Sequence, residues 1–126
     1  MTDPRRTVVV VEDDDHVRRA LTRLLKSRGY GVRAFDSAEA WLAVVAPADG
    51  AVIDINLPGM NGLELDERLM REGRAIPTVF ITAHDEPGPA AGRVILQKPV
   101  DVHALLDALG HALAARDGGR VARDPA

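Results

Sequence analysis

The sequence predicts an α/β fold, a doubly wound parallel sheet covered by helices on both faces. Short apolar runs rich in valine and isoleucine alternate with segments of helical period, a pattern typical of a parallel sheet buried on both sides. Four of these runs lead directly into polar residues, at Glu12 and Asp13, at Asp54, at Thr82 and at Lys98. The carboxyl ends of parallel strands meet at one edge of a sheet, so we expect these side chains to converge on one pocket.

Length and composition limit the possible functions. The chain has 126 residues, of which 46% are hydrophobic, enough for one domain and too few for a second. It contains no cysteine, which excludes disulfides and thiolate metal sites, and its net charge of −3 offers no basic footprint for nucleic acid. No apolar stretch approaches the roughly 20 residues that cross a bilayer. We therefore expect a cytoplasmic protein with no membrane partner.

The first strand is expected at residues 7–11, followed by a helix. Either Asp14 or Asp15 is expected to cap this helix, and Gly29 ends it. Its apolar residues recur at helical spacing on one stripe, which contains Val17, Ala20, Leu21, Leu24 and Leu25.

The second unit begins with a strand at residues 32–35. Ser37 then provides an N-cap for a helix that Pro47 and Gly50 are expected to end. The apolar residues of this helix are Trp41, Leu42 and Val45.

The third strand ends at Asp54 and is followed by turn-forming residues at 57–62. Asn61 is expected to cap the next helix, and Pro77 to open the fourth strand, which ends at Thr82. The apolar residues of that helix are Leu63, Leu65, Leu69 and Met70.

The fifth strand is expected at residues 93–97, and Asp101 is expected to cap the last helix. Residues 117–126 consist mainly of Gly, Arg, Asp and Pro, which predicts a flexible tail or the start of a linker. The apolar stripe of the last helix contains Val102, Leu105, Leu106, Leu109 and Leu113.

The acidic residues at the strand ends indicate phosphoryl chemistry. A carboxylate such as Asp54 becomes a nucleophile toward phosphorus only when a hard cation offsets its charge and that of the phosphoryl group. Mg²⁺ is suitable, because it binds through a few carboxylates together with carbonyl and phosphate oxygens. We expect Glu12, Asp13 and Asp54 to supply the carboxylates, and Asn56 to supply its main-chain carbonyl.

Two further residues suit a phosphoryl group. Lys98 offers a compact positive charge and Thr82 a hydroxyl donor. Taken singly, each of these residues has an ordinary alternative explanation. An aspartate at a strand end is more often a turn or cap residue, and an isolated threonine or lysine is an ordinary surface residue. Only their combination favours a functional site.

Four motifs occur in order: Val-Glu-Asp-Asp-Asp-His-Val-Arg from residue 11, Asp-Ile-Asn-Leu-Pro-Gly-Met-Asn-Gly from residue 54, Ile-Thr-Ala-His from residue 81 and Gln-Lys-Pro from residue 97. Together they resemble the receiver domain of two-component response regulators over residues 7–115. The resemblance implies a flavodoxin-like sheet in the order 2-1-3-4-5 and a receiver domain at residues 1–116.

By this resemblance, Asp54 is the phosphoacceptor, and Glu12 and Asp13 are the acidic pair that holds Mg²⁺. Thr82 is then the switch hydroxyl and Lys98 the phosphate-sensing cation, with a cis peptide bond before Pro99. The implied partner is a sensor histidine kinase or a phosphotransfer protein. The chain is expected to be no enzyme beyond its own phosphorylation and dephosphorylation.

The sequence departs from the family pattern in two places. Only 15 residues separate Thr82 from Lys98, so the fourth helix, between strands four and five, is reduced to residues 87–92. Two prolines and two glycines limit these residues to about one turn of helix. The second departure is Ile95, where the family usually has Tyr or Phe.

A shortened fourth helix should uncover apolar side chains at residues 79–81 and 94–96. An exposed apolar patch often marks a contact surface, so we expect a homodimer or another partner there. The alternative is that residues 83–92 fold back and cover the patch themselves.

The sequence thus predicts a magnesium-dependent phosphoacceptor switch. One alternative is a pseudo-receiver, a binding module that works without phosphorylation. Another is a small magnesium-dependent phosphatase that uses Asp54 in turnover. This last hypothesis is disfavoured, because the sequence offers no lid and no second acid or base near Asp54.

Overall fold

The computed structural model describes residues 6–44, 47–83 and 94–123, and the side chains up to residue 116. Its centre is one parallel sheet with the strand order β2-β1-β3-β4-β5, which confirms the predicted fold class and strand order. The strands are β1 (Thr7–Val11), β2 (Gly31–Phe35), β3 (Gly50–Asp54), β4 (Thr78–Thr82) and β5 (Val94–Gln97).

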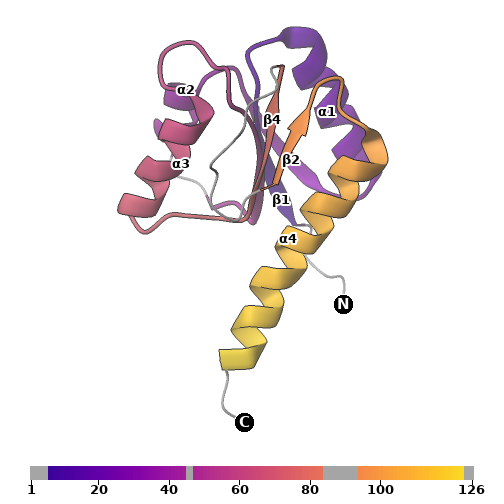
Figure 1. Ribbon diagram of the computed structural model, residues 1–126, viewed down its shortest axis with the longest axis vertical. Helices are drawn as coiled ribbons and strands as arrows, with labels where there is room; N and C mark the ends of the chain where they lie inside the picture. The colour runs from indigo at the N-terminus through magenta and orange to yellow at the C-terminus, as the bar shows by residue number, and fades with distance from the viewer. Residues whose placement is uncertain (1–5, 45–46, 84–93, 124–126) are drawn as a thin grey trace.

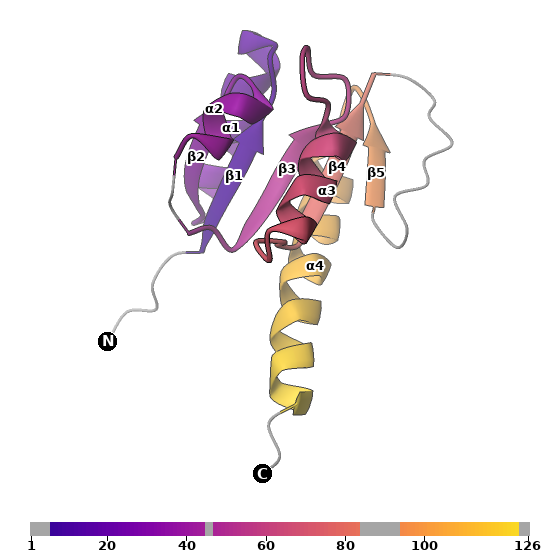
Figure 2. The same cartoon turned by 90° about the vertical axis from the view of Figure 1, so that its left-hand side faces the viewer.

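Helices cover both faces of this sheet. The helices of the described chain are α1 (Asp15–Ser27), α2 (Ala38–Leu42), α3 (Gly62–Arg71) and α4 (Val102–Arg123). Figure 1 shows α2 and α3 on one side of the sheet and α1 and α4 on the other. Figure 2 looks onto the face that carries α2 and α3, with the sheet behind them and the end of α4 extending past the sheet.

The helices begin where cap residues were predicted. The side chains of Asp14, Ser37 and Asn61 accept backbone N–H bonds at the starts of α1, α2 and α3, and Asp101 does the same for α4. At α3, Glu64 returns a bond to the backbone of Asn61 and completes a capping box. Each cap contributes about 1 kcal/mol, so local chemistry fixes these boundaries.

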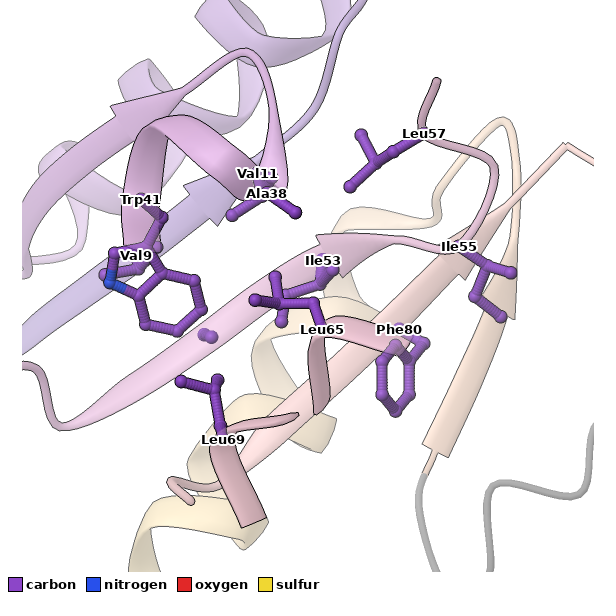
Figure 3. Close-up of a cluster of buried hydrophobic side chains, with 11 residues drawn as sticks. Val9, Val11, Ala38, Trp41, Ile53, Ile55, Leu57, Leu65, Leu69 and Phe80 are labelled. Carbon is purple, nitrogen blue, oxygen red and sulfur yellow. The ribbon is translucent and has the colours of Figure 1, made fainter. Parts of the chain in front are cut away.

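Alternate residues of each central strand pack on opposite faces of the sheet. Figure 3 shows the cluster under α2 and α3, where Trp41, Leu65 and Leu69 meet Val9, Val11, Ile53 and Phe80. Under α1 and α4 a second cluster joins Leu21, Leu25, Leu105 and Leu109 to Val8, Val10, Val52, Val79 and Ile81. This alternation explains why β1, β3 and β4 read as unbroken apolar runs.

The predicted exposure of β4 is wrong. Val79, Phe80 and Ile81 are all 0% exposed. Phe80 belongs to the cluster under α2 and α3, and the other two belong to the cluster that includes the leucines of α4. In β5 the prediction holds in part, because Val94 is 43% exposed while Ile95 and Leu96 are half-buried.

Two helices differ in length from their predictions. Helix α2 ends at Leu42, before the predicted stop, and Val45 lies outside the described residues. Helix α4 continues to Arg123, so most of the predicted tail is helical; its two glycines weaken a helix but do not break it as proline would. The domain boundary at residue 116 stays a prediction. Residues 87–92, predicted as a shortened helix, lie outside the described residues.

Candidate functional site

Three carboxylates meet at the carboxyl edge of the sheet. Glu12 and Asp13 follow β1, and Asp54 is the last residue of the neighbouring strand β3. Each offers an oxygen, and the three oxygens lie within 4.8 Å of one another. Glu12 is 0% and Asp54 2% exposed, whereas Asp13 faces solvent. Three carboxylate oxygens at this spacing, with one side open, fit the ligand preferences of a hard divalent cation.

Lys98 brings a positive charge to the same place from the end of β5. Its Nζ lies 2.7 Å from Glu12 Oε1 and 3.1 Å from Asp54 Oδ2. Its backbone N–H donates to the carbonyl of Thr82 at 2.7 Å, which ties the end of β5 to the end of β4. The Lys98–Pro99 peptide bond is cis, as predicted.

Burial and charge change the proton affinities of this pair. Burial raises the pKa of Glu12 to about 7; Lys98 opposes this shift and Asp54 adds to it. Burial alone would lower the pKa of Lys98, but its contacts with Glu12 and Asp54 outweigh that effect and the pKa is raised. Lys98 therefore carries its charge at neutral pH, and Glu12 titrates near neutrality when no cation is bound.

Asn56 connects the two strand ends. Its backbone N–H donates to Asp54 Oδ1 at 2.9 Å. Its side-chain Oδ1 accepts a hydrogen bond from the Thr82 hydroxyl at 2.8 Å and another from the Ala83 N–H at 3.2 Å. The structure thus gathers Glu12, Asp13, Asp54, Asn56, Thr82 and Lys98 at one edge.

The family model for the response regulator receiver domain matches residues 8–110 of the chain. The chain belongs to this family. Of the curated relatives, the transcriptional regulatory protein TdiR of Thauera aromatica is 37% identical over 116 residues, an alignment that covers 86% of this chain and 51% of TdiR. The chain spans about half the length of the curated relatives it matches.

Solved receiver structures share its fold. The response regulator StyR is 41% identical with a TM-score of 0.84, over 96% of this chain and 65% of StyR. A response regulator receiver protein from Burkholderia phymatum is 36% identical with a TM-score of 0.75, over 87% of this chain and 96% of that one. In the described part of this receiver, no helix has both the length and the apolar character needed to cross a bilayer.

Two contacts hold the loop after β3. The Glu39 carboxylate of α2 accepts the Met60 N–H at 3.0 Å, which joins α2 to this loop. At the start of α3, a Cβ on Gly62 would lie 2.4 Å from the Asp54 carbonyl oxygen, so only glycine allows this approach. The turn motif signalled the glycine, but nothing in the sequence signalled the Glu39 contact.

The start of α1 supports Glu12 in a similar way. The Glu12 Oε2 accepts the Asp14 N–H at 3.1 Å, and the Arg18 guanidinium donates to the Glu12 carbonyl at 3.0 Å. Arg18 also pairs with Asp15. The two acidic residues after the metal-binding candidates therefore help to build the site's frame, one by capping α1 and one by fixing Arg18.

Proposed function

We propose that this receiver is a phosphoacceptor switch in which Asp54 takes a phosphoryl group from a sensor histidine kinase or a phosphotransfer protein. The observation that supports it most is the surroundings of Asp54. The Lys98 ammonium lies 3.1 Å from one of its oxygens, and oxygens of Glu12 and Asp13 lie within 4.8 Å. Opposite charge and cation ligands on two sides are what an aspartate nucleophile requires.

In the proposed reaction, an Asp54 carboxylate oxygen attacks phosphorus while the bond from phosphorus to the donor nitrogen breaks. The products are an acyl phosphate on Asp54 and the free imidazole of the donor. Glu12, Asp13, Asp54 and the main-chain carbonyl of Asn56 would hold Mg²⁺, which when bound neutralises charge on the phosphoryl oxygens. Lys98 then balances the charge of a second oxygen.

The acyl phosphate acts as a signal through its new acceptor oxygens. We infer that the Thr82 hydroxyl turns toward one of them and biases the loop after β4. We further propose that this signalling takes place in the cytoplasm and involves no direct contact of this chain with nucleic acid.

Intact-mass spectrometry after treatment with acetyl phosphate and Mg²⁺ tests the proposal. We expect one phosphoryl group on the wild type and none on Asp54→Asn. Asp107→Asn, which makes the same change on an exposed face of α4, is the matched control and should be labelled as the wild type is. Hydroxylamine should remove the label, because it cleaves acyl phosphates.

Labelling of Asp54→Asn would place the phosphoryl group elsewhere. A wild type that no donor labels, neither acetyl phosphate nor any histidine kinase, would favour the pseudo-receiver.

A further inference from the structure

The side chain of Asn56 is hydrogen-bonded to two donors that lie close to Asp54 in the fold. Its Oδ1 accepts the Thr82 hydroxyl at 2.8 Å and the Ala83 N–H at 3.2 Å. Both donors stand at the carboxyl end of β4, whose neighbour β3 ends at Asp54; in the register of the two strands, Asp54 lies opposite Ile81. One amide oxygen therefore engages two consecutive donors on the strand next to the carboxylate.

Because these donors follow the residue opposite Asp54 on the neighbouring strand, they are candidate partners for a phosphoryl group on Asp54. A phosphoryl group brings three acceptor oxygens, and Lys98, at 3.1 Å from the carboxylate, can serve one of them. The adjacent hydroxyl and N–H are suited to another. In the unphosphorylated protein, however, the Asn56 amide already engages both.

We propose that the Asn56 side chain is a latch that holds the Thr82 hydroxyl and the Ala83 N–H in the resting state and releases them to the phosphoryl group. This inference rests on the proposed function of Asp54. Asn56 is a positioning residue here: its side chain sets how readily the end of β4 responds to phosphorylation, whereas its backbone N–H bond to Asp54 Oδ1 does not depend on the side chain.

The exposure of the partners explains why the latch can open. Thr82 is 2% exposed, so its hydroxyl must pass from one protein acceptor to another. Asn56 is exposed, so its amide can bond to water once it is displaced. A charged phosphoryl oxygen is roughly twice as strong an acceptor as a neutral amide, which favours the exchange. The amide still has to be displaced, and this cost opposes switching.

The rival explanation is that Asn56 only braces the loop after β3. The two explanations predict opposite effects of Asn56→Ala. Without a latch to displace, a phosphoryl mimic should bind more tightly; without a brace, the loop should loosen and the mimic should bind more weakly. The affinity for beryllium fluoride separates them, because this ion binds a carboxylate oxygen with the shape and charge of a phosphoryl group.

Calorimetric titration of beryllium fluoride in saturating Mg²⁺ is the experiment. We expect Asn56→Ala to bind it about fivefold more tightly than wild type, the size of one ordinary hydrogen bond. The affinity for Mg²⁺ alone is measured beside it, because Asn56 belongs to the proposed metal site, and only a gain beyond any change in Mg²⁺ affinity supports the latch. Asn61→Ala is the matched control, because it removes an amide from the same loop, one whose oxygen accepts the Glu64 N–H at the start of α3. It should give no gain in affinity.

Two further measurements decide whether the gain in beryllium fluoride affinity comes from release of the Thr82 hydroxyl and the Ala83 N–H. In a Thr82→Val background, the gain from Asn56→Ala should shrink, as expected for two side chains that interact directly. In spectra of ¹⁵N-labelled protein without beryllium fluoride, the Ala83 amide of Asn56→Ala should move away from its wild-type position, as expected for an N–H that has lost its acceptor. A gain of the same size in the Thr82→Val background would exclude the hydroxyl as the latched group.

Unchanged or weaker binding by Asn56→Ala would overturn the latch. A fivefold gain in Asn61→Ala would overturn it as well, because loosening of the loop would then account for the effect. Either result would overturn the latch alone and leave the proposed function intact, provided that the wild type binds beryllium fluoride and Asp54→Asn does not. If the wild type itself failed to bind beryllium fluoride, the proposed function would be contradicted.

Discussion

The central strands and the edge strand β5 both end in the site, but they are packed very differently. Every residue of β3 and β4 is buried, whereas β5 has no fully buried residue and its Val94 is 43% exposed. The central strands deliver the carboxylates of Glu12 and Asp54, and the edge strand delivers Lys98. The acidic half of the site thus rests on the core, and the cationic half rests on the rim of the sheet.

This difference indicates how the site is assembled. Burying Glu12 and Asp54 side by side is unfavourable, and the packing of β1 and β3 holds them in place despite that cost. Lys98 is held mainly by contacts within the site. Its ammonium forms ion pairs with Glu12 and Asp54, and its backbone N–H donates to the Thr82 carbonyl. We infer that the acidic geometry is fixed by the core, while the end of β5 adjusts to whatever occupies the site.

The comparison can be tested most strongly through stability. Ile81 of β4 is 0% exposed, and Ile95 of the adjacent β5 is half-buried. We expect Ile81→Ala to lower the free energy of unfolding by about 2–5 kcal/mol, the range for fully buried isoleucines, and Ile95→Ala to lower it by less than about half as much. Urea denaturation measures both values. Equal losses would show that the edge strand is packed as firmly as the centre.

The same contrast explains what could be predicted from the sequence. Strand positions follow from apolar runs and helix starts from cap residues such as Asp14 and Asn61, and both signals are local. Residues at the ends of parallel strands must share an edge, so the meeting of Glu12, Asp54 and Lys98 could be predicted too.

Hydrogen bonds from a side chain to a distant segment of the chain left no such signal. The bonds from Thr82 and Ala83 to Asn56, and from Met60 to Glu39, depend on where the loops pass in space. The burial of β4 also escaped prediction. It arises from the two side-chain clusters that include Phe80 on one face and Val79 and Ile81 on the other, whereas the sequence pattern only located the elements.

A second test concerns the acidic half of the site. Because the pKa of Glu12 is raised to about 7, a proton competes with the cation below that pH, and the carboxylate becomes available above it. Mg²⁺ affinity of the unphosphorylated protein should therefore rise about tenfold as the pH goes from about 6 to about 8. Calorimetric titration across this range measures it.

Two variants show which carboxylate causes the pH dependence of Mg²⁺ affinity. Glu12→Gln, which cannot ionise, should bind Mg²⁺ weakly and lose most of the pH dependence. Asp13→Ala should lower the affinity about tenfold at every pH, because a carboxylate ligand is lost, and should keep the dependence on Glu12. If Asp13→Ala binds Mg²⁺ as well as the wild type does, the cation lies elsewhere; a flat wild-type profile would show that Glu12 is ionised well below pH 7.

The smallest effect is expected at the outer rim of β5. Because β4 is buried on both faces, Val94 is the exposed large apolar residue among the described residues of β4 and β5. A single side chain is far smaller than the roughly 800 Å² per partner of a standard interface. We therefore expect Val94→Glu to change the free energy of unfolding by no more than about 0.5 kcal/mol, as surface substitutions do, and to leave the sedimentation coefficient unchanged.

A wild-type dimer that Val94→Glu dissociates would show instead that this edge associates with a second copy. Leu96→Glu serves as the comparison, since its half-buried side chain packs against the cluster under α1 and α4 and its charge should cost stability whether or not the chain self-associates.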